Sequence, residues 1–228
     1  MQLKDGQNIE ELLIGRLKPA STLNERAYHS LTYEAGIKTV REEIRSKALS
    51  NKHLTAREQI EIIDSGLRVI RAQLANNYDF LDKKMQAARQ GQAETNPSNP
   101  QRTFPKNLLS DLDEKMGVLD VQDGEKYDLR FYIASGTILD FAGSFDCWVE
   151  LYDLEKGKSV ADVKIDIKTK PGANPHNLAD IVYYFDSNKY LKEYDKVDMG
   201  YRQDAEYSGM LREAASILMR RAKITRPS

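Results

Sequence analysis

Cysteine, histidine and long apolar segments are all scarce in this chain of 228 residues, which has one cysteine and three histidines. A single cysteine, Cys147, excludes an intrachain disulfide and any zinc or iron–sulfur site built on cysteines. His29, His53 and His176 are far apart in the sequence, so we do not expect a metal site built on histidines. No segment is apolar enough to span a membrane, and the first residues lack the apolar core of a signal peptide. We therefore expect a cytoplasmic protein with no membrane partner.

An excess of charge of one sign is also lacking. The chain holds 34 Lys and Arg against 35 Asp and Glu, and the formal net charge is −1. The bulk charge therefore does not indicate a polyelectrolyte partner. No glycine-rich phosphate loop, dinucleotide fingerprint or Ser/His/Asp arrangement is present, so the classes of protein that depend on these motifs are not expected.

The sequence pattern of residues 1–90 predicts a helical region. Thr55-Ala-Arg-Glu58 has the form of a capping box, in which each side chain satisfies a backbone N–H at the start of a helix. Apolar residues then recur at alternating spacings of three and four; they are Ile60, Ile63, Leu67, Ile70 and Leu74, continued by Tyr78 and Leu81. This heptad pattern predicts one helix over roughly 55–90. The helix could belong to an antiparallel helical hairpin, or it could form a dimer seam or an arm that binds a partner protein.

The pattern changes after residue 90. Residues 91–105 lack apolar periodicity and contain three prolines, which predicts a linker. Residues 106–228 then predict a helix, several strands and a last helix over about 202–221, an order typical of an α+β fold. We therefore expect a helical region at 1–90, a linker at 91–105 and a second, mixed unit at 106–228.

Two segments of the second unit, SFDCWVELYD and SVADVKIDIKT, alternate between apolar and polar residues and predict a strand pair. The alternation favours a register with three cross-strand pairs, which are Glu150 with Lys164, Trp148 with Asp166, and Asp146 with Lys168. This register gathers Asp146, Asp166 and Lys168, and it leaves Asp162 and Lys164 to solvent. Two carboxylates on adjacent strands can chelate a hard divalent cation, and a nearby lysine can orient water. The other interpretation is a solvated sheet face whose charges form cross-strand ion pairs.

Three motifs occur in order along the second unit. They are Gly143-Ser-Phe-Asp146, Asp166-Ile-Lys168-Thr169 and Gln203-Asp-Ala-Glu-Tyr207. Together they resemble the PD-(D/E)xK nuclease superfamily, and specifically its RecB-like branch. The segment YRQDAEYSGM is similar to the corresponding region of phage-type RecE exonucleases. The resemblance covers about residues 105–221 and implies a restriction-endonuclease-like α/β core with a mixed sheet.

The resemblance also implies roles for individual residues. Asp146 and Asp166, helped by the carbonyl of Ile167, would bind Mg²⁺ or Mn²⁺, and Lys168 would position the attacking water. On the predicted helices, Gln203 and Tyr207 would support the site and contact the DNA backbone. Glu114 would be a further carboxylate associated with the metal ion. Candidates for contacts with nucleic acid are Trp148, Lys170 and Arg202.

The sequence therefore predicts a metal-dependent nuclease that hydrolyses DNA, either an exonuclease or a restriction-type enzyme of a phage or mobile element. The rival prediction is a non-enzymatic interaction protein, or a degenerate nuclease that binds DNA without cutting it. In the rival case the helix at 55–90 contacts a partner protein or a second copy of the chain.

Overall fold

The computed structural model describes residues 13–14, 46, 55–92, 96–117, 126–135, 137–168, 178–186 and 200–224. At its centre lies a sheet of four strands, β1 (Tyr127–Ile133), β2 (Cys147–Asp153), β3 (Lys158–Lys168) and β4 (Ile181–Tyr184), in that order across the sheet. β1, β2 and β3 are antiparallel neighbours, whereas β4 runs parallel to β3. Helices accompany this mixed sheet, which confirms the predicted α+β class. The predicted N-terminal helical hairpin needs residues before 55, and most of these lie outside the described residues.

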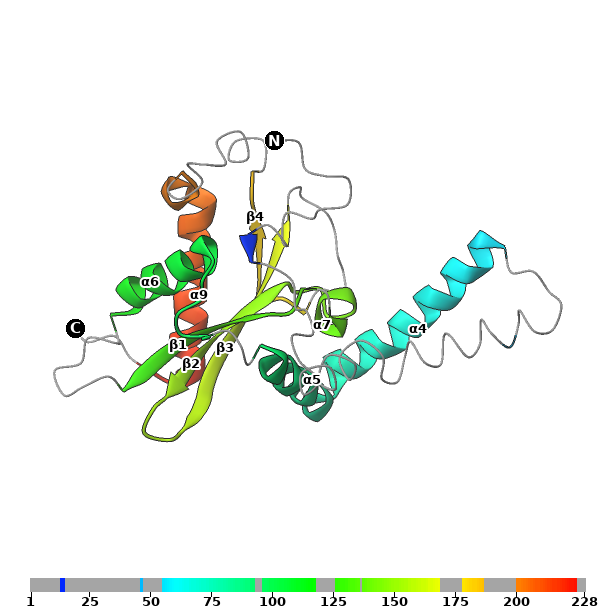
Figure 1. The fold of residues 1–228 in the computed structure, drawn as a ribbon, viewed down its shortest axis with the longest axis horizontal. Coiled ribbons are helices and arrows are strands. Elements are labelled where there is room, and N and C mark those ends of the chain that lie inside the picture. The colour runs from blue at the N-terminus through cyan, green and yellow to red at the C-terminus, as the bar shows by residue number, and fades with distance from the viewer. Residues whose placement is uncertain are drawn as a thin grey trace.

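Helices α6 (Thr103–Met116) and α9 (Ala205–Ala222) cover one face of the sheet (Figure 1). In α9 the buried residues recur at helical spacing, as Tyr207, Leu211, Ala214 and Leu218 do. This stripe packs with the inward-facing apolar residues of β2 and β3 in one continuous core. The first helix predicted in the second unit and the last helix, predicted over about 202–221, therefore cover this face.

The opposite face of the sheet is also covered, which argues against the alternative interpretation of a solvated sheet face. A second core joins this face to α5 (Tyr78–Gly91), α7 (Ile138–Phe141) and the last turns of α4 (Ala56–Asn76). Trp148 and Glu150 of β2 are 0% and 2% exposed here. The period-two pattern had marked these residues as polar-side, but helices from distant parts of the chain remove that side from water.

The helix predicted over 55–90 is two helices. The capping box at Thr55 is confirmed, with both reciprocal hydrogen bonds to Glu58 present. The break falls at Asn77, whose side chain accepts a hydrogen bond from the N–H of Phe80 and caps α5. Asparagine favours such caps because its side chain competes with the helical backbone for hydrogen bonds. Beyond the break the heptad pattern fails at Tyr78, which is 85% exposed, whereas Leu81 is partly buried against the second core.

Residues of the predicted linker contact the outer edge of β1. The side chain of Gln92 accepts a hydrogen bond from the N–H of Ile133 and donates one to its carbonyl. The carbonyl of Pro97 accepts a hydrogen bond from the N–H of Phe131. These contacts satisfy backbone groups that an edge strand otherwise leaves unpaired. The division of the chain into domains at 91–105 remains a prediction.

The register of β2 and β3 differs from the predicted one by two residues. Trp148 lies opposite Lys164, and Glu150 lies opposite Asp162. A bulge between Leu151 and Tyr152 precedes the turn. Because side chains alternate with a period of two, a shift by two residues keeps every side chain on its face, so the apolar pattern could not distinguish the two registers.

Candidate active site

Backbone hydrogen bonds fix Asp146 at the start of β2. Its N–H donates to the carbonyl of Ile165 at 2.9 Å, and its carbonyl accepts from the N–H groups of Ala134 and Ser135 at 2.7 and 2.9 Å. Continuing the observed register by one residue beyond Cys147–Ile165 places Asp146 directly opposite Asp166. The two carboxylates therefore lie closer together than the predicted diagonal arrangement would allow.

The approach to Asp146 needs a glycine. A Cβ atom on Gly143 would collide with the carbonyl oxygen of Leu139 and lie 3.0 Å from the ring of Phe145. The carbonyl of Gly143 also accepts a hydrogen bond from the N–H of Leu178 at 2.9 Å. The next residue, Ser144, has a positive φ of 55°, which is uncommon for a residue with a side chain. The glycine of the first motif thus serves close packing in the turn that delivers Asp146.

Asp146 and Asp166 form a buried pair of carboxyl groups, 4% and 1% exposed. Their side chains are hydrogen-bonded to each other. Asp146 also accepts a hydrogen bond from the N–H of Ile167 at 2.6 Å. On the other side of the pair, Nζ of Lys168 lies 2.9 Å from Oδ1 of Asp166. The structure thus brings together three of the predicted site residues.

The environment of Asp146 favours its protonated form. Burial raises the pKa of Asp146 to about 8, and the negative charges of Asp140 and Asp166 add to the effect, while the hydrogen bond from Ile167 opposes it. At neutral pH the pair therefore holds a proton, which lies in the hydrogen bond between the two carboxyl groups. The negative charge of Asp146 is thus removed by a proton, and a bound metal ion could take the place of that proton.

A second acidic pair on the same two strands provides an internal comparison. Glu150 lies opposite Asp162, and Asp162-Val-Lys164 repeats the spacing of Asp166-Ile-Lys168. Glu150, however, accepts hydrogen bonds from Nε of Arg89 at 2.7 Å and from Nε1 of Trp148 at 2.8 Å. Its charge is thus balanced within the fold.

Asp146 differs from Glu150 in this respect. Among the residues that the structure describes, Asp146 forms no ion pair. Of the two acidic pairs, the one at Asp146 is therefore suited to an added cation.

Tyr207 does not reach this pair, and Gln203 does not lie on the helix that was predicted for it. The helix predicted from residue 202 begins at Ala205, and Gln203 lies before it in a short 3-10 turn, η2 (Tyr201–Gln203), with its side chain exposed. Tyr207 is fully buried in the core that also contains Ile167. Because successive side chains of a strand point to opposite faces, Asp166 points away from that core. Tyr207 therefore lies on the other face of the sheet from the carboxylate pair.

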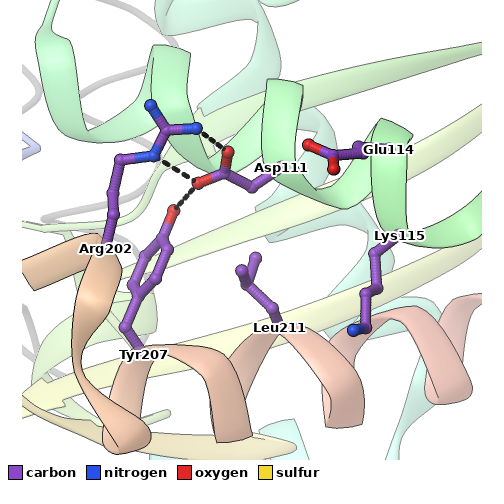
Figure 2. Close-up of a pocket in the computed structure, with 6 residues that line it drawn as sticks. All are labelled: Asp111, Glu114, Lys115, Arg202, Tyr207 and Leu211. Atoms are coloured by element: carbon purple, nitrogen blue, oxygen red, sulfur yellow. Dashed lines mark hydrogen bonds and ion pairs between the residues drawn. The ribbon is translucent and has the colours of Figure 1, made fainter.

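Tyr207 belongs instead to a polar cluster between α6 and α9 (Figure 2). Its hydroxyl donates to Oδ2 of Asp111 at 2.9 Å, and Arg202 donates to both carboxylate oxygens, through Nε at 3.0 Å and through Nη2. Glu114 and Lys115 line the same open pocket, which has a volume of about 470 Å³. Glu114 was predicted to assist the metal site, and Arg202 was predicted to contact nucleic acid. The structure places both residues at this pocket instead.

Asp111 was missed in the sequence, although one signal was present. It follows Leu108 by three residues and precedes Leu112, so it is a charged residue within the buried stripe of α6. A carboxylate at such a position needs partners, because burying it alone would cost several kcal/mol. Its partners, Arg202 and Tyr207, come from a segment 91 or more residues away.

The other predicted nucleic-acid contacts differ in their placement. Trp148 is fully buried and stacks on Tyr132 with ring centroids 5.1 Å apart, so its ring is closed to a base in this structure. Lys170 lies outside the described residues. Across the described ranges, no three His, Cys, Asp or Glu side chains are grouped so that they could hold a metal ion. None of the helices described has both the length and the apolar character needed to cross a membrane.

Comparison with known proteins identifies no relative. The chain matches no protein-family model, no curated protein and no solved structure. Any function assigned to it therefore has to be argued from the motifs and from the geometry of the sites.

Proposed function

We propose that the chain is a metal-dependent nuclease that hydrolyses phosphodiester bonds of DNA, either an exonuclease or a restriction-type enzyme of a phage or mobile element. The observation that carries this proposal is the pair formed by Asp146 and Asp166, buried, directly opposed and hydrogen-bonded, with the ammonium group of Lys168 beside it. The order of the three motifs and the mixed sheet support the same class of protein.

The oxygen atoms of the pair fit a hard divalent cation. Carboxylates are the ligands that Mg²⁺ and Mn²⁺ take in proteins, and Mg²⁺ usually keeps several waters besides one or two carboxylates. Asp146 and Asp166, with the carbonyl of Ile167, would hold the ion in place of the proton that they share. When bound, the ion would stabilise the negative charge that develops on the phosphate during hydrolysis.

Lys168 supplies a charge that reaches solvent. Its side chain is 40% exposed, whereas the carboxylate that it contacts is 1% exposed. In this proposal its ammonium group would lie between the buried pair and an approaching substrate. There it would orient a water molecule and attract a phosphate oxygen.

Cleavage of linear and circular DNA in Mg²⁺ or Mn²⁺ tests the proposal. The Asp166→Asn and Lys168→Met variants should each lose cleavage by at least about a hundredfold, as removal of one stabilising group in an active site commonly does. Asp162→Asn and Lys164→Met are matched controls, because they change the same residue types, at the same spacing, on the same face of β3. The controls should cut DNA at the wild-type rate.

A second measurement detects the metal ion without any cleavage. Mn²⁺ should raise the melting temperature of the wild type, because a ligand that binds only the folded state stabilises it. The Asp166→Asn variant should show a much smaller rise. Equal cleavage by Asp166→Asn and Asp162→Asn, or equal stabilisation of both by Mn²⁺, would refute the proposed site.

The projection of α4 away from the sheet favours a second candidate function (Figure 1). Among the side chains of α4 that the structure describes, Ile70 and Leu74 in its last turns belong to the core. In this second proposal the chain is an interaction protein, or a degenerate nuclease, whose helix contacts a partner protein or a second copy. DNA binding without metal-dependent cleavage by the wild type, or sedimentation as a dimer that α4 variants disrupt, would favour it.

A further inference from the structure

The pocket between α6 and α9 is separate from the carboxylate pair. Tyr207 at its floor packs in the core on the face of the sheet that α6 and α9 cover, whereas Asp166 points to the other face. The pocket volume of about 470 Å³ lies in the range of small-molecule sites. It is therefore large enough for a nucleotide-sized ligand.

Asp111 holds the guanidinium group of Arg202 in a fixed orientation at this pocket. The carboxylate of Asp111 is 9% exposed and receives Nε and Nη2 of Arg202 together with the hydroxyl of Tyr207. Burial, together with the hydrogen bond to Asp111, raises the pKa of Tyr207, so its hydroxyl remains a donor. A carboxylate with these donors needs no further ligand, and the paired fork restricts the rotamers of Arg202.

One side of Arg202 remains available. Over the described residues, Nη1 of Arg202 donates no hydrogen bond, and the side chain is 33% exposed. Lys115 lines the pocket from α6, so two cationic side chains reach it from two different elements (Figure 2). The acidic residues of the lining are Asp111, which Arg202 neutralises, and Glu114.

We propose that this pocket is an anion site that binds a phosphate group, carried by a free nucleotide or by a nucleic-acid strand. Arg202, held by Asp111, presents two charged N–H groups of its free Nη1 to the phosphate, and Lys115 supplies a second positive charge. Glu114 opposes the charge of the anion and limits the affinity. The proposal does not rest on cleavage at Asp146 and Asp166, because it concerns binding at a different face.

Binding measured by calorimetry in EDTA tests this site while the carboxylate pair holds no metal. The probes are inorganic phosphate, deoxyadenosine monophosphate and a short single-stranded oligodeoxynucleotide without terminal phosphates. Lys115→Gln and Arg202→Gln should each weaken binding, the latter by about tenfold or more, as loss of a charge-assisted hydrogen bond predicts. Glu114→Gln should strengthen binding several-fold.

Arg212→Gln is the matched control, because Arg212 is an exposed arginine of α9 that does not line the pocket. It should bind all three probes as the wild type does. Arg202→Gln leaves Asp111 with fewer partners and could unfold the protein. The exposed residues Glu114 and Lys115 keep the test decisive, because their substitution leaves the contacts of Asp111 intact.

The three probes distinguish the source of the phosphate. Binding of the monophosphate with little binding of the oligonucleotide assigns the site to free nucleotides, and the reverse assigns it to phosphodiesters of a strand. If no probe binds, or if Glu114→Gln and Lys115→Gln change affinity in the same direction, the proposed anion site is wrong. Asp166→Asn should bind the probes normally even where it has lost cleavage, so failure of one proposal does not imply failure of the other.

Discussion

Replacing Asp146 by asparagine should change how the stability of the protein depends on pH. An asparagine at this position can accept the hydrogen bond from the N–H of Ile167 and donate one to Asp166, as the protonated carboxyl does. The substitution therefore keeps the geometry of the pair and removes only its ability to ionise. The difference in the free energy of unfolding between variant and wild type then depends on the ionisation of this one carboxyl group.

The size of the effect follows from the raised pKa of Asp146. In the unfolded chain this carboxyl ionises near pH 3.8, and in the folded protein it keeps its proton up to about pH 8. Between these values the folded state binds one more proton than the unfolded state, so the free energy of unfolding falls as pH rises, by about 1.4 kcal/mol per pH unit. The stability that this group contributes is complete below pH 4 and is lost as pH rises toward 8.

Urea denaturation at pH 5, 6 and 7 in EDTA measures this dependence. The free energy of unfolding of Asp146→Asn, relative to wild type, should increase by roughly 3 kcal/mol from pH 5 to pH 7. Glu155→Gln, in the exposed turn between β2 and β3, is the control and should follow the wild type at each pH. A constant difference between Asp146→Asn and wild type over this range would show that Asp146 is already ionised in the folded protein, and the reasoning about the shared proton would be refuted.

Three further predictions concern the surroundings of the pair. Arg89→Met should destabilise the protein by about 3–5 kcal/mol in urea denaturation, because it leaves the buried carboxylate of Glu150 without its cation. Adding Glu150→Gln to this variant should recover part of the lost stability, and no recovery would contradict the pairing of Arg89 with Glu150. Gly143→Ala should lower the free energy of unfolding by about 1–3 kcal/mol and weaken Mn²⁺ binding, because the added methyl group would collide with the carbonyl of Leu139. A variant with the stability and the metal binding of the wild type would contradict this. Trp148 is the only tryptophan and is fully buried, so acrylamide should quench its fluorescence poorly in the folded protein and efficiently in urea.

Some features of the site could be predicted from the sequence because they depend on local pattern. The alternation in the two segments around Asp146 and Asp166 placed these residues on one face, since the period of a strand is two. The capping box at Thr55 was found because its two partners are three residues apart. The last helix was likewise predicted from local pattern, over about 202–221, and α9 spans Ala205–Ala222.

Other features needed the tertiary structure because their partners are distant in sequence. Two of the helices that cover the second face of the sheet, α4 and α5, come from residues 56–91, so the pattern of β2 alone made Trp148 and Glu150 look solvent-exposed. Arg89 finds Glu150 across 61 residues, and this contact separates the balanced acidic pair from the one at Asp146. No local pattern encodes which of two similar carboxylates a distant arginine will neutralise.

By itself the sequence determined the class of fold, the strand pair β2 and β3 and the face on which their charged residues lie, because these follow from hydrophobic period and local capping. Only the tertiary structure decided which residues oppose each other, since a shift of two residues leaves the apolar pattern unchanged. That shift brought Asp146 opposite Asp166. It was also the packing of α6 against η2 and α9 that joined Asp111 to Arg202 and Tyr207, on the other face of the sheet from the pair with which the third motif had associated Tyr207.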